Sequence, residues 1–287
     1  DRGLAVNALE QGVFTASCLR HAVPAAFRRR WWAVWWPLAL AQAAWLAALV
    51  CFAHPLVAGA MVPMLAALAG PDVVHYPNVF RVLPGLHARG AFAIFALVGP
   101  VVSGAAAIVF DEGFSGRGVA AGRALGAALR RAPALIAAQA PLQLVLIALT
   151  FGTAGWLEAR GSSGLVVRLL TFASLGASVV VQAAFLYVPA FVMLGGCRPH
   201  EAWREMPRAF GRAGAVALLL VGLAAVVGLP IQAAASMADR IVERGRPELM
   251  VAVVAAQAAL GLVVSFVLAG AAVLAYRSLL EPPEDEA

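Results

Sequence analysis

The sequence contains no lysine, few charged residues and only three cysteines. Charged side chains make up 13% of the 287 residues, against roughly 25% in an ordinary soluble domain. Cys18, Cys51 and Cys197 lie far apart and form no CxxC pair, so the sequence has neither a disulfide framework nor metal-ligand spacing. GxSxG, HExxH and P-loop motifs are also absent. We therefore expect no enzymatic activity, no catalytic residue, no cofactor and no metal.

Apolar residues are what the sequence has in abundance. They account for 62% of the chain, and the mean hydropathy is +0.86. They form uncharged runs of about 20 residues, the length that a helix needs to cross a bilayer core of roughly 30 Å. Because backbone groups in lipid must bond within their own segment, and no period-2 pattern indicates a barrel, these runs predict helices. The predicted fold class is an all-α polytopic membrane protein.

Six transmembrane helices are predicted, and they pair into three hairpins. The spans cover about 31–53, 91–110, 133–156, 166–194, 215–236 and 249–276. We expect each hairpin to be preceded by a cytoplasmic amphipathic helix lying in the membrane interface. The single integral membrane domain, 1–287, then divides into hairpin units of about 1–112, 113–196 and 197–280. An acidic tail, 281–287, is expected to be disordered.

Each of the three amphipathic helices ends in a short arginine-containing segment, here called a joint, that leads into the following span. In the third, Arg204, Arg208 and Arg212 share one helical face, opposite Trp203 and Phe210. Such a phase directs guanidinium groups toward headgroups and water. The residues predicted to contact the interface or lipid are Arg28, Arg29, Arg30, Arg123, Arg130, Arg131, Arg204, Arg208 and Arg212.

The arginines also predict orientation. Fourteen fall on one side of the predicted spans and seven on the other. Positively charged loops favour the cytoplasm, so both termini are predicted to be cytoplasmic. Abundant alanine and glycine without lysine suggest a GC-rich bacterial sequence and hence the bacterial inner membrane. Orientation and anionic lipid account for the basic charge without nucleic acid.

Glutamine is the polar residue that recurs within the predicted spans. One interpretation makes these side chains interhelical hydrogen-bonding groups, each contributing roughly 0.6 to 2 kcal/mol. The other makes them line a polar path or a lipid-headgroup pocket. No acidic residue, lysine or histidine lies in the middle of a span, which argues against a proton relay or an ion-coupled carrier. The predicted polar membrane cluster comprises Gln42, Gln139, Gln143, Gln182, Gln232 and Gln257.

Two smaller patterns bear on packing. Gly118, Gly122 and Gly126 form a small-residue row that either admits a partner helix or seats its own helix on this chain's spans. Four tryptophans follow the first joint, and an aromatic belt at the cytoplasmic interface explains them better than a pigment or quinone site does. They are Trp31, Trp32, Trp35 and Trp36.

The first hairpin differs from the others by a long external segment, 54–90. Its first part, 55–70, is apolar but short for a span, which favours a re-entrant or interfacial helix. Its second part, 71–90, is either a solvated loop or a surface that contacts a partner or substrate. The residues of this predicted partner loop are His75, Tyr76, Asn78, Phe80, Arg81 and His87.

Two segments, 121–133 and 189–214, carry a family resemblance. Each holds a cytoplasmic helix with a basic joint, and Pro189 stands in an inward span before the second. The chain resembles the six-span bacterial membrane proteins related to YciC and to the membrane domain associated with glycerophosphodiester phosphodiesterases. This resemblance implies the hairpin layout and supplies no catalytic residues. The accompanying phosphodiesterase is a separate soluble module, which we do not expect within these 287 residues.

Absent catalytic motifs and abundant packing surfaces favour a non-enzymatic inner-membrane scaffold or accessory subunit of a membrane protein assembly. The expected partners are membrane lipids and other membrane protein subunits. One alternative is a permease subunit of a transporter, whose cytoplasmic helices occupy positions where an ATPase would dock. The other alternative is a lipid-interacting membrane protein.

Overall fold

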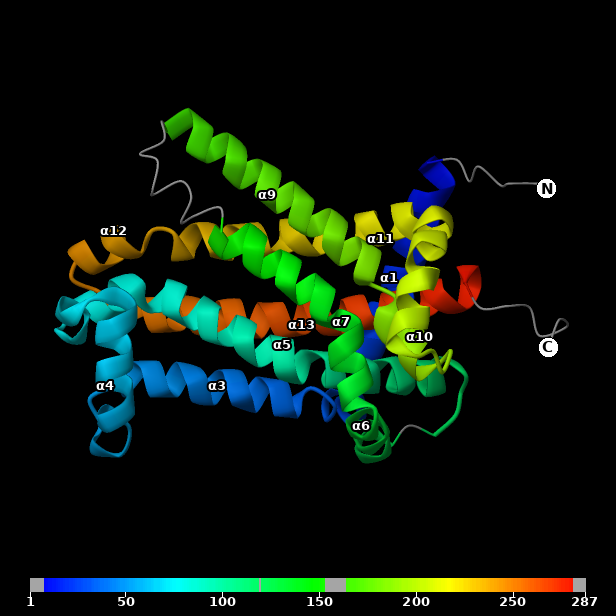
Figure 1. Cartoon of the computed structure of the whole chain (residues 1–287), viewed down its shortest axis with the longest axis horizontal. Coiled ribbons are helices and arrows are strands. Elements are labelled where there is room, and N and C mark those ends of the chain that lie inside the picture. Colours follow the sequence, from blue (N-terminus) through cyan, green and yellow to red (C-terminus); the bar gives the residue numbers. More distant parts are fainter. Residues whose placement is uncertain (1–7, 119, 153–163, 281–287) are drawn as a thin grey trace, which may run out of the picture. The chain divides into compact units, whose positions relative to one another are not determined.

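The computed structural model describes residues 8–118, 120–152 and 164–280, which form helices and turns but no strand. The acidic tail and the end of the predicted third span lie outside these residues. Figure 1 shows the elements in chain order. They are α1 (Ala8–Ala26), α2 (Arg29–Trp32), α3 (Trp36–Val50), α4 (Pro55–Ala69), the 3-10 turn η1 (Pro71–Val74), α5 (Asn78–Phe114), α6 (Ala121–Arg130), α7 (Ala132–Ile147), the π-helical turn η2 (Ala148–Gly152), α9 (Gly164–Phe185), α10 (Val188–Met193), α11 (Pro199–Ala235), α12 (Ala238–Glu243) and α13 (Leu249–Leu279).

The all-α polytopic prediction is confirmed. Among the described residues, five helical segments are long and apolar enough to cross a membrane, and a bent pair raises the number to as many as six. The pair is α3 and α4, which meet at 83° (Figure 1). At 1.5 Å per residue, the 15 residues of α3 extend only about 22 Å, short of a roughly 30 Å bilayer core. The predicted first span, 31–53, is therefore a broken element and not one straight helix.

Two predicted loops or joints are helical instead. The predicted partner loop is largely the start of α5, because Val79, Leu83 and Leu86 recur at helical spacing and are buried. The third amphipathic helix is continuous with its span in α11. Ala202, Ala209 and Ala213 are buried on one face across the joint, so packing outweighs the helix-weakening effect of the intervening glycine.

The fourth predicted span, 166–194, is interrupted near its C-terminal end. The structure divides it into α9 and α10, with Leu186 and Tyr187 between them. Pro189 is the second residue of α10, where its missing N–H is tolerated, and it cannot donate a helical hydrogen bond to the carbonyl of Phe185, the last residue of α9. The break therefore follows from proline geometry.

The chain forms two compact units that cut across the three predicted hairpins. Unit 1 contains Asp1–Val34, Pro100–Ala225 and Phe266–Ala287, and unit 2 contains Trp35–Gly99 and Val226–Ser265. Helices α5, α11 and α13 contribute residues to both units.

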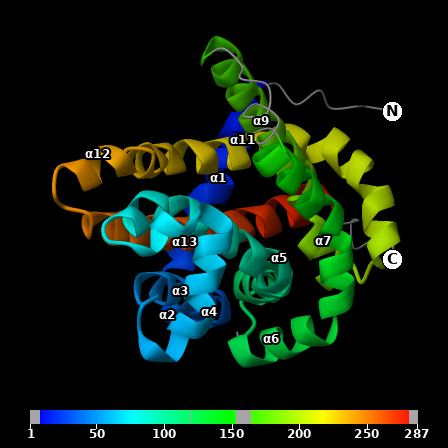
Figure 2. The same cartoon turned by 60° about the vertical axis from the view of Figure 1, so that its left-hand side comes forward.

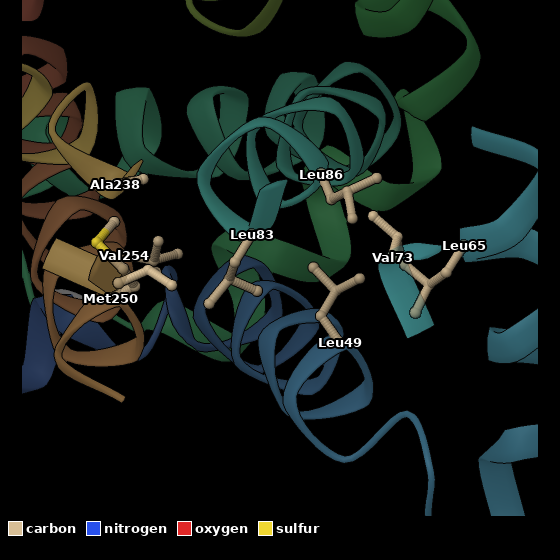
Figure 3. Close-up of a cluster of buried hydrophobic side chains, with 9 residues drawn as sticks. Leu49, Leu65, Val73, Leu83, Leu86, Ala238, Met250 and Val254 are labelled. Carbon is tan, nitrogen blue, oxygen red and sulfur yellow. The ribbon is translucent and has the colours of Figure 1, made fainter. Parts of the chain in front are cut away.

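Unit 2 has an aliphatic core. Figure 3 shows Leu83 between Val254 and Leu49, with Leu86 near Val73. The core joins α3, α4, η1, α5, α12 and α13, and its buried members are Leu49, Leu65, Val73, Leu83, Leu86, Ala238, Val242, Met250 and Val254. Through this core, Leu65 of α4 shares one buried cluster with Leu83 and Leu86 of α5.

Unit 1 contains a cluster of aromatic rings besides its buried alanine, valine and leucine side chains. Trp31 on α2 contacts Phe110 edge-on, with ring centroids 5.2 Å apart, and Phe114 at 6.1 Å. Gly113 leaves room for the indole, since a Cβ there would lie 2.3 Å from the ring. Trp31 is 4% exposed, so it packs within this cluster and does not belong to the predicted aromatic belt.

The aromatic-belt interpretation also fails for Trp35. Its side chain is buried within unit 2, whereas that of Trp36 is exposed. Of the four tryptophans, Trp36 is the one whose exposure suits an interfacial ring.

Candidate functional site

Polar contacts in unit 1 concentrate where helices are interrupted. Pro141 lies inside α7, where it cannot donate to the carbonyl of Ala137 and disturbs the helical bonding of that turn. The neighbouring Ala138 carbonyl accepts a hydrogen bond from Trp203 Nε1 of α11 at 2.9 Å. This tie between α7 and α11 was not predicted, and its only sequence signal is the proline three residues after Ala138.

A second tie forms at the end of α10. Arg131 Nη1 donates to the Val192 carbonyl at 2.6 Å, where the helix leaves carbonyls without partners. Gly196 has a φ of +67°, and the Cys197 amide donates to the Phe191 carbonyl at 3.0 Å, which completes the helix end. Figure 2 shows the sharp turn from α6 into α7 from which Arg131 extends. The guanidinium predicted to contact lipid thus caps a helix of its own chain.

The other predicted lipid-contacting arginines are distributed over three elements. Arg204, Arg208 and Arg212 are exposed on the first part of α11, and Arg208 pairs with Glu205 at 2.9 Å. Arg123 and Arg130 are exposed on α6. Arg28 stacks on the Trp31 ring, 5.3 Å from its centroid. The side chains of Arg29 and Arg30 lie outside the described part of the structure.

The α11 arginine face is held in place by a helix cap. The Arg198 amide donates to Glu201 Oε2 at 2.6 Å, and Pro199 occupies the first helical position. A glutamate three residues after the N-cap and a proline at the first position both stabilise a helix start. Local sequence therefore fixes the phase that exposes Arg204 and Arg208 opposite buried Ala202.

The six glutamines do not lie together in one compact unit. Gln139 and Gln143 are buried one turn apart on α7, while Gln182 is exposed on α9. In unit 2, Gln42 and Gln257 are half-buried and Gln232 is exposed. The candidate polar site thus reduces to Gln139 and Gln143. Both side-chain amide atoms of Gln143 are buried, and neither has a hydrogen-bond partner among the described residues.

The glycine row at the start of α6 is open. A Cβ at Gly118, Gly122 or Gly126 would meet nothing within 4 Å among the described residues. Helix α6 instead buries Ala124 and Ala128. The interpretation in which these glycines pack α6 against the chain's own spans is therefore wrong for the described residues.

The predicted partner loop is partly tied down and partly buried. Tyr76 donates to Glu248 Oε1 at 2.9 Å, and its ring meets Phe80 edge-on at 5.9 Å. Asn78 Nδ2 donates to the Asp72 carbonyl at 3.1 Å. His75 and Arg81 are exposed, but His87 is 5% exposed. His87 therefore cannot contact a partner as predicted, because it lies on the packed side of α5, next in sequence to the core residue Leu86.

The described residues contain no group of three or more histidine, cysteine, aspartate or glutamate side chains that could hold a metal ion. Burial raises the pKa of the Cys18 thiol to about 11, and burial followed by the nearby Glu201 and Glu205 raises the pKa of Cys197. Both thiols are therefore protonated at neutral pH, whereas a reactive cysteine is a thiolate.

Comparisons of the chain with protein-family models, curated proteins and solved structures found no match.

Proposed function

We propose that this chain is a non-enzymatic membrane scaffold or accessory subunit that docks a partner helix on α9. The supporting observation is how little of α9 its own chain covers. In the most apolar stretch of the Leu169–Met193 segment, 11% is buried, compared with 44% in α5. Ser174 ties α9 to the Leu149 carbonyl at 3.2 Å on one side, which leaves the other side open.

The open side of α9 has the features of a helix-packing surface. Leu169, Phe172, Gly176 and Val180 recur at helical spacing and are exposed, Phe172 to 71%. A Cβ at Gly176 would meet nothing within 4 Å, so another helix can approach closely there. Apolar side chains alone would suit lipid equally well. A small residue between large ones lets another helix approach closely, which favours a protein helix over lipid as the neighbour of this surface.

Exposed Gln182 adds a polar argument. Hydrocarbon offers an amide no hydrogen-bond partner, whereas a neighbouring membrane helix does. At 3.6 residues per turn, however, Gln182 lies about 120° around α9 from Gly176, so its amide would need a contact beside the Gly176 face and not on it. The open glycine row of α6 offers a second close-approach surface within unit 1.

The experiment is mild solubilisation of tagged native protein, followed by native mass spectrometry of wild type, Gly176→Leu and Gly261→Leu. Gly261 on α13 is the matched control, because it is also an exposed helical glycine whose Cβ would meet nothing within 4 Å. We expect a stoichiometric partner with wild type and Gly261→Leu and its loss with Gly176→Leu. A wild-type protein that runs only as a bare monomer contradicts the proposal.

A lipid-interacting role is the second candidate, and the exposed arginine face of α11 favours it. Anionic headgroups attract such a face with about 1 kcal/mol per arginine near the surface. Replacing Arg204, Arg208 and Arg212 by glutamine should weaken retention of anionic lipid through purification. Equal lipid retention by wild type and the triple variant excludes this role for the face.

A further inference from the structure

The side chain of Gln143 is the least satisfied polar group of α7. It is 6% exposed, and both its carbonyl oxygen and its amide nitrogen are buried without a partner in the described chain. An amide in this condition loses its hydrogen bonds to water and gains none in return. Buried polar groups normally have partners, so Gln143 requires an explanation.

The residues around Gln143 do not supply its missing hydrogen-bond partner. Gln139 precedes Gln143 by one turn of α7, so the two residues lie on the same side of the helix. Gln139 is 5% exposed on the same face. The two side chains do not bond each other, since Gln143 has no such partner.

We propose that Gln143, with Gln139 beside it, binds an uncharged hydroxyl group from water or from the glycerol part of a lipid. A hydroxyl both donates and accepts, and an amide offers the complementary acceptor and donors. A charged guest at membrane depth would need a countercharge, and α7 itself contains no charged residue. The site lies on α7 and does not depend on partner docking at α9.

The direct test is proton NMR of side-chain amides in lipid nanodiscs. The chain has seven glutamines, so protein labelled with ¹⁵N at glutamine gives few side-chain signals. The spectrum of Gln143→Leu identifies the Gln143 pair. We expect cross-peaks from this pair to water or to lipid glycerol protons, and deuterated lipid distinguishes the two sources. Cross-peaks to neither would overturn the proposal.

A stability measurement supplies an independent outcome. If the amide binds nothing, replacing it by leucine removes an unsatisfied group, and the unfolding midpoint rises. If it binds a hydroxyl, Gln143→Leu loses that bond, and the midpoint does not rise above wild type. Gln232→Leu, at an exposed glutamine of α11, is the matched control for the change in side chain. A higher midpoint for Gln143→Leu than for both wild type and this control counts against the site.

Discussion

The interiors of the two compact units are stabilised by different kinds of contact. Unit 2 packs aliphatic side chains such as Leu83 and Met250, and the hydrogen bond from Tyr76 to Glu248, which joins two of its turns, is exposed. Unit 1 packs aromatic rings and adds side-chain donors to backbone carbonyls, as in Trp203 to Ala138 and Arg131 to Val192. The Ala138 carbonyl lies in the turn that Pro141 disturbs, and the Val192 carbonyl lies at the end of α10.

The difference has a physical reason. Lipid tails are as apolar as leucine, so burial alone does not select one helix contact over another within a bilayer. A hydrogen bond to a freed carbonyl is directional and selects one arrangement. Unit 1 therefore has the means to specify a unique packing, whereas unit 2 relies on the fit of its aliphatic side chains.

The largest effect is expected in the aliphatic core of unit 2. Leu83→Ala should destabilise the protein by about 2 to 5 kcal/mol, because it leaves a cavity at a side chain that is almost fully buried. Leu97→Ala is the matched control on the same helix and in the same unit, since Leu97 is 65% exposed. Equilibrium unfolding in detergent measures both. Equal losses would mean that the aliphatic cluster is not the core of unit 2.

The second prediction concerns a glycine that lies close to a tryptophan ring in each unit. A Cβ at Gly113 would lie 2.3 Å from the Trp31 ring, and one at Gly90 would lie 2.1 Å from the Trp45 ring. Overpacking typically costs about 1 to 3 kcal/mol. We expect Gly113→Ala to cost more, because Trp31 is buried against Phe110 and Phe114 while Trp45 is only half-buried and has room to shift.

The control for this pair is Gly122→Ala, where an added Cβ meets nothing within 4 Å. Alanine improves helix propensity by up to about 1 kcal/mol, so this variant should be neutral or more stable. A greater loss of stability for Gly90→Ala than for Gly113→Ala would mean that Trp45, and not Trp31, is the ring that yields less to the added methyl group.

Much of the helical layout was predictable, because uncharged runs and proline spacing are local properties of the chain. The errors arose where packing outweighs local signals. Pro84 and Gly85 suggest a loop, yet Leu83 and Leu86 bury into the aliphatic core and keep α5 helical. Gly211 suggests a break, yet α11 continues through it.

The candidate sites were harder to predict, because a helical period does not reveal which neighbour covers a face. Gln143 and Gln182 look alike in sequence, but one is buried and the other exposed. Arg131 follows the lipid-facing pattern of the joints, yet it caps α10 at Val192, 61 residues away. Such long-range partners have no local signal.

A smaller effect is expected from the directional ties of unit 1. Trp203→Phe keeps an aromatic side chain but loses the hydrogen bond from Nε1 to the Ala138 carbonyl, at a cost of about 0.5 to 1.5 kcal/mol in stability. Pro141→Ala should restore the helical bonding of that turn, so the same tryptophan change should cost less in the Pro141→Ala background. A double-mutant cycle measures this coupling. Additive losses would show that the proline does not free the carbonyl.

The smallest effect is expected at the exposed tie of unit 2. Hydrogen bonding to the Glu248 carboxylate, followed by desolvation and the carboxylate charge, raises the pKa of Tyr76 above its ordinary value of 10. Because the folded pKa lies above the unfolded one, the tie stabilises fully below pH 10 and is lost as pH rises through the raised value. Unfolding midpoints of wild type and Tyr76→Phe should therefore differ slightly at neutral pH and converge in strong alkali.

A titration separates this tie from general alkaline unfolding. The chain has three tyrosines, so the absorbance difference between wild type and Tyr76→Phe isolates the Tyr76 phenol. Glu248→Gln keeps a hydrogen-bond acceptor but removes the negative charge, so it should move the pKa of this phenol back toward its ordinary value. If the Tyr76 titration were the same with glutamate and glutamine at 248, the carboxylate would not hold the tyrosine. The hydrogen bond between these two turns of unit 2 would then contribute nothing, and the contrast with unit 1 would become sharper.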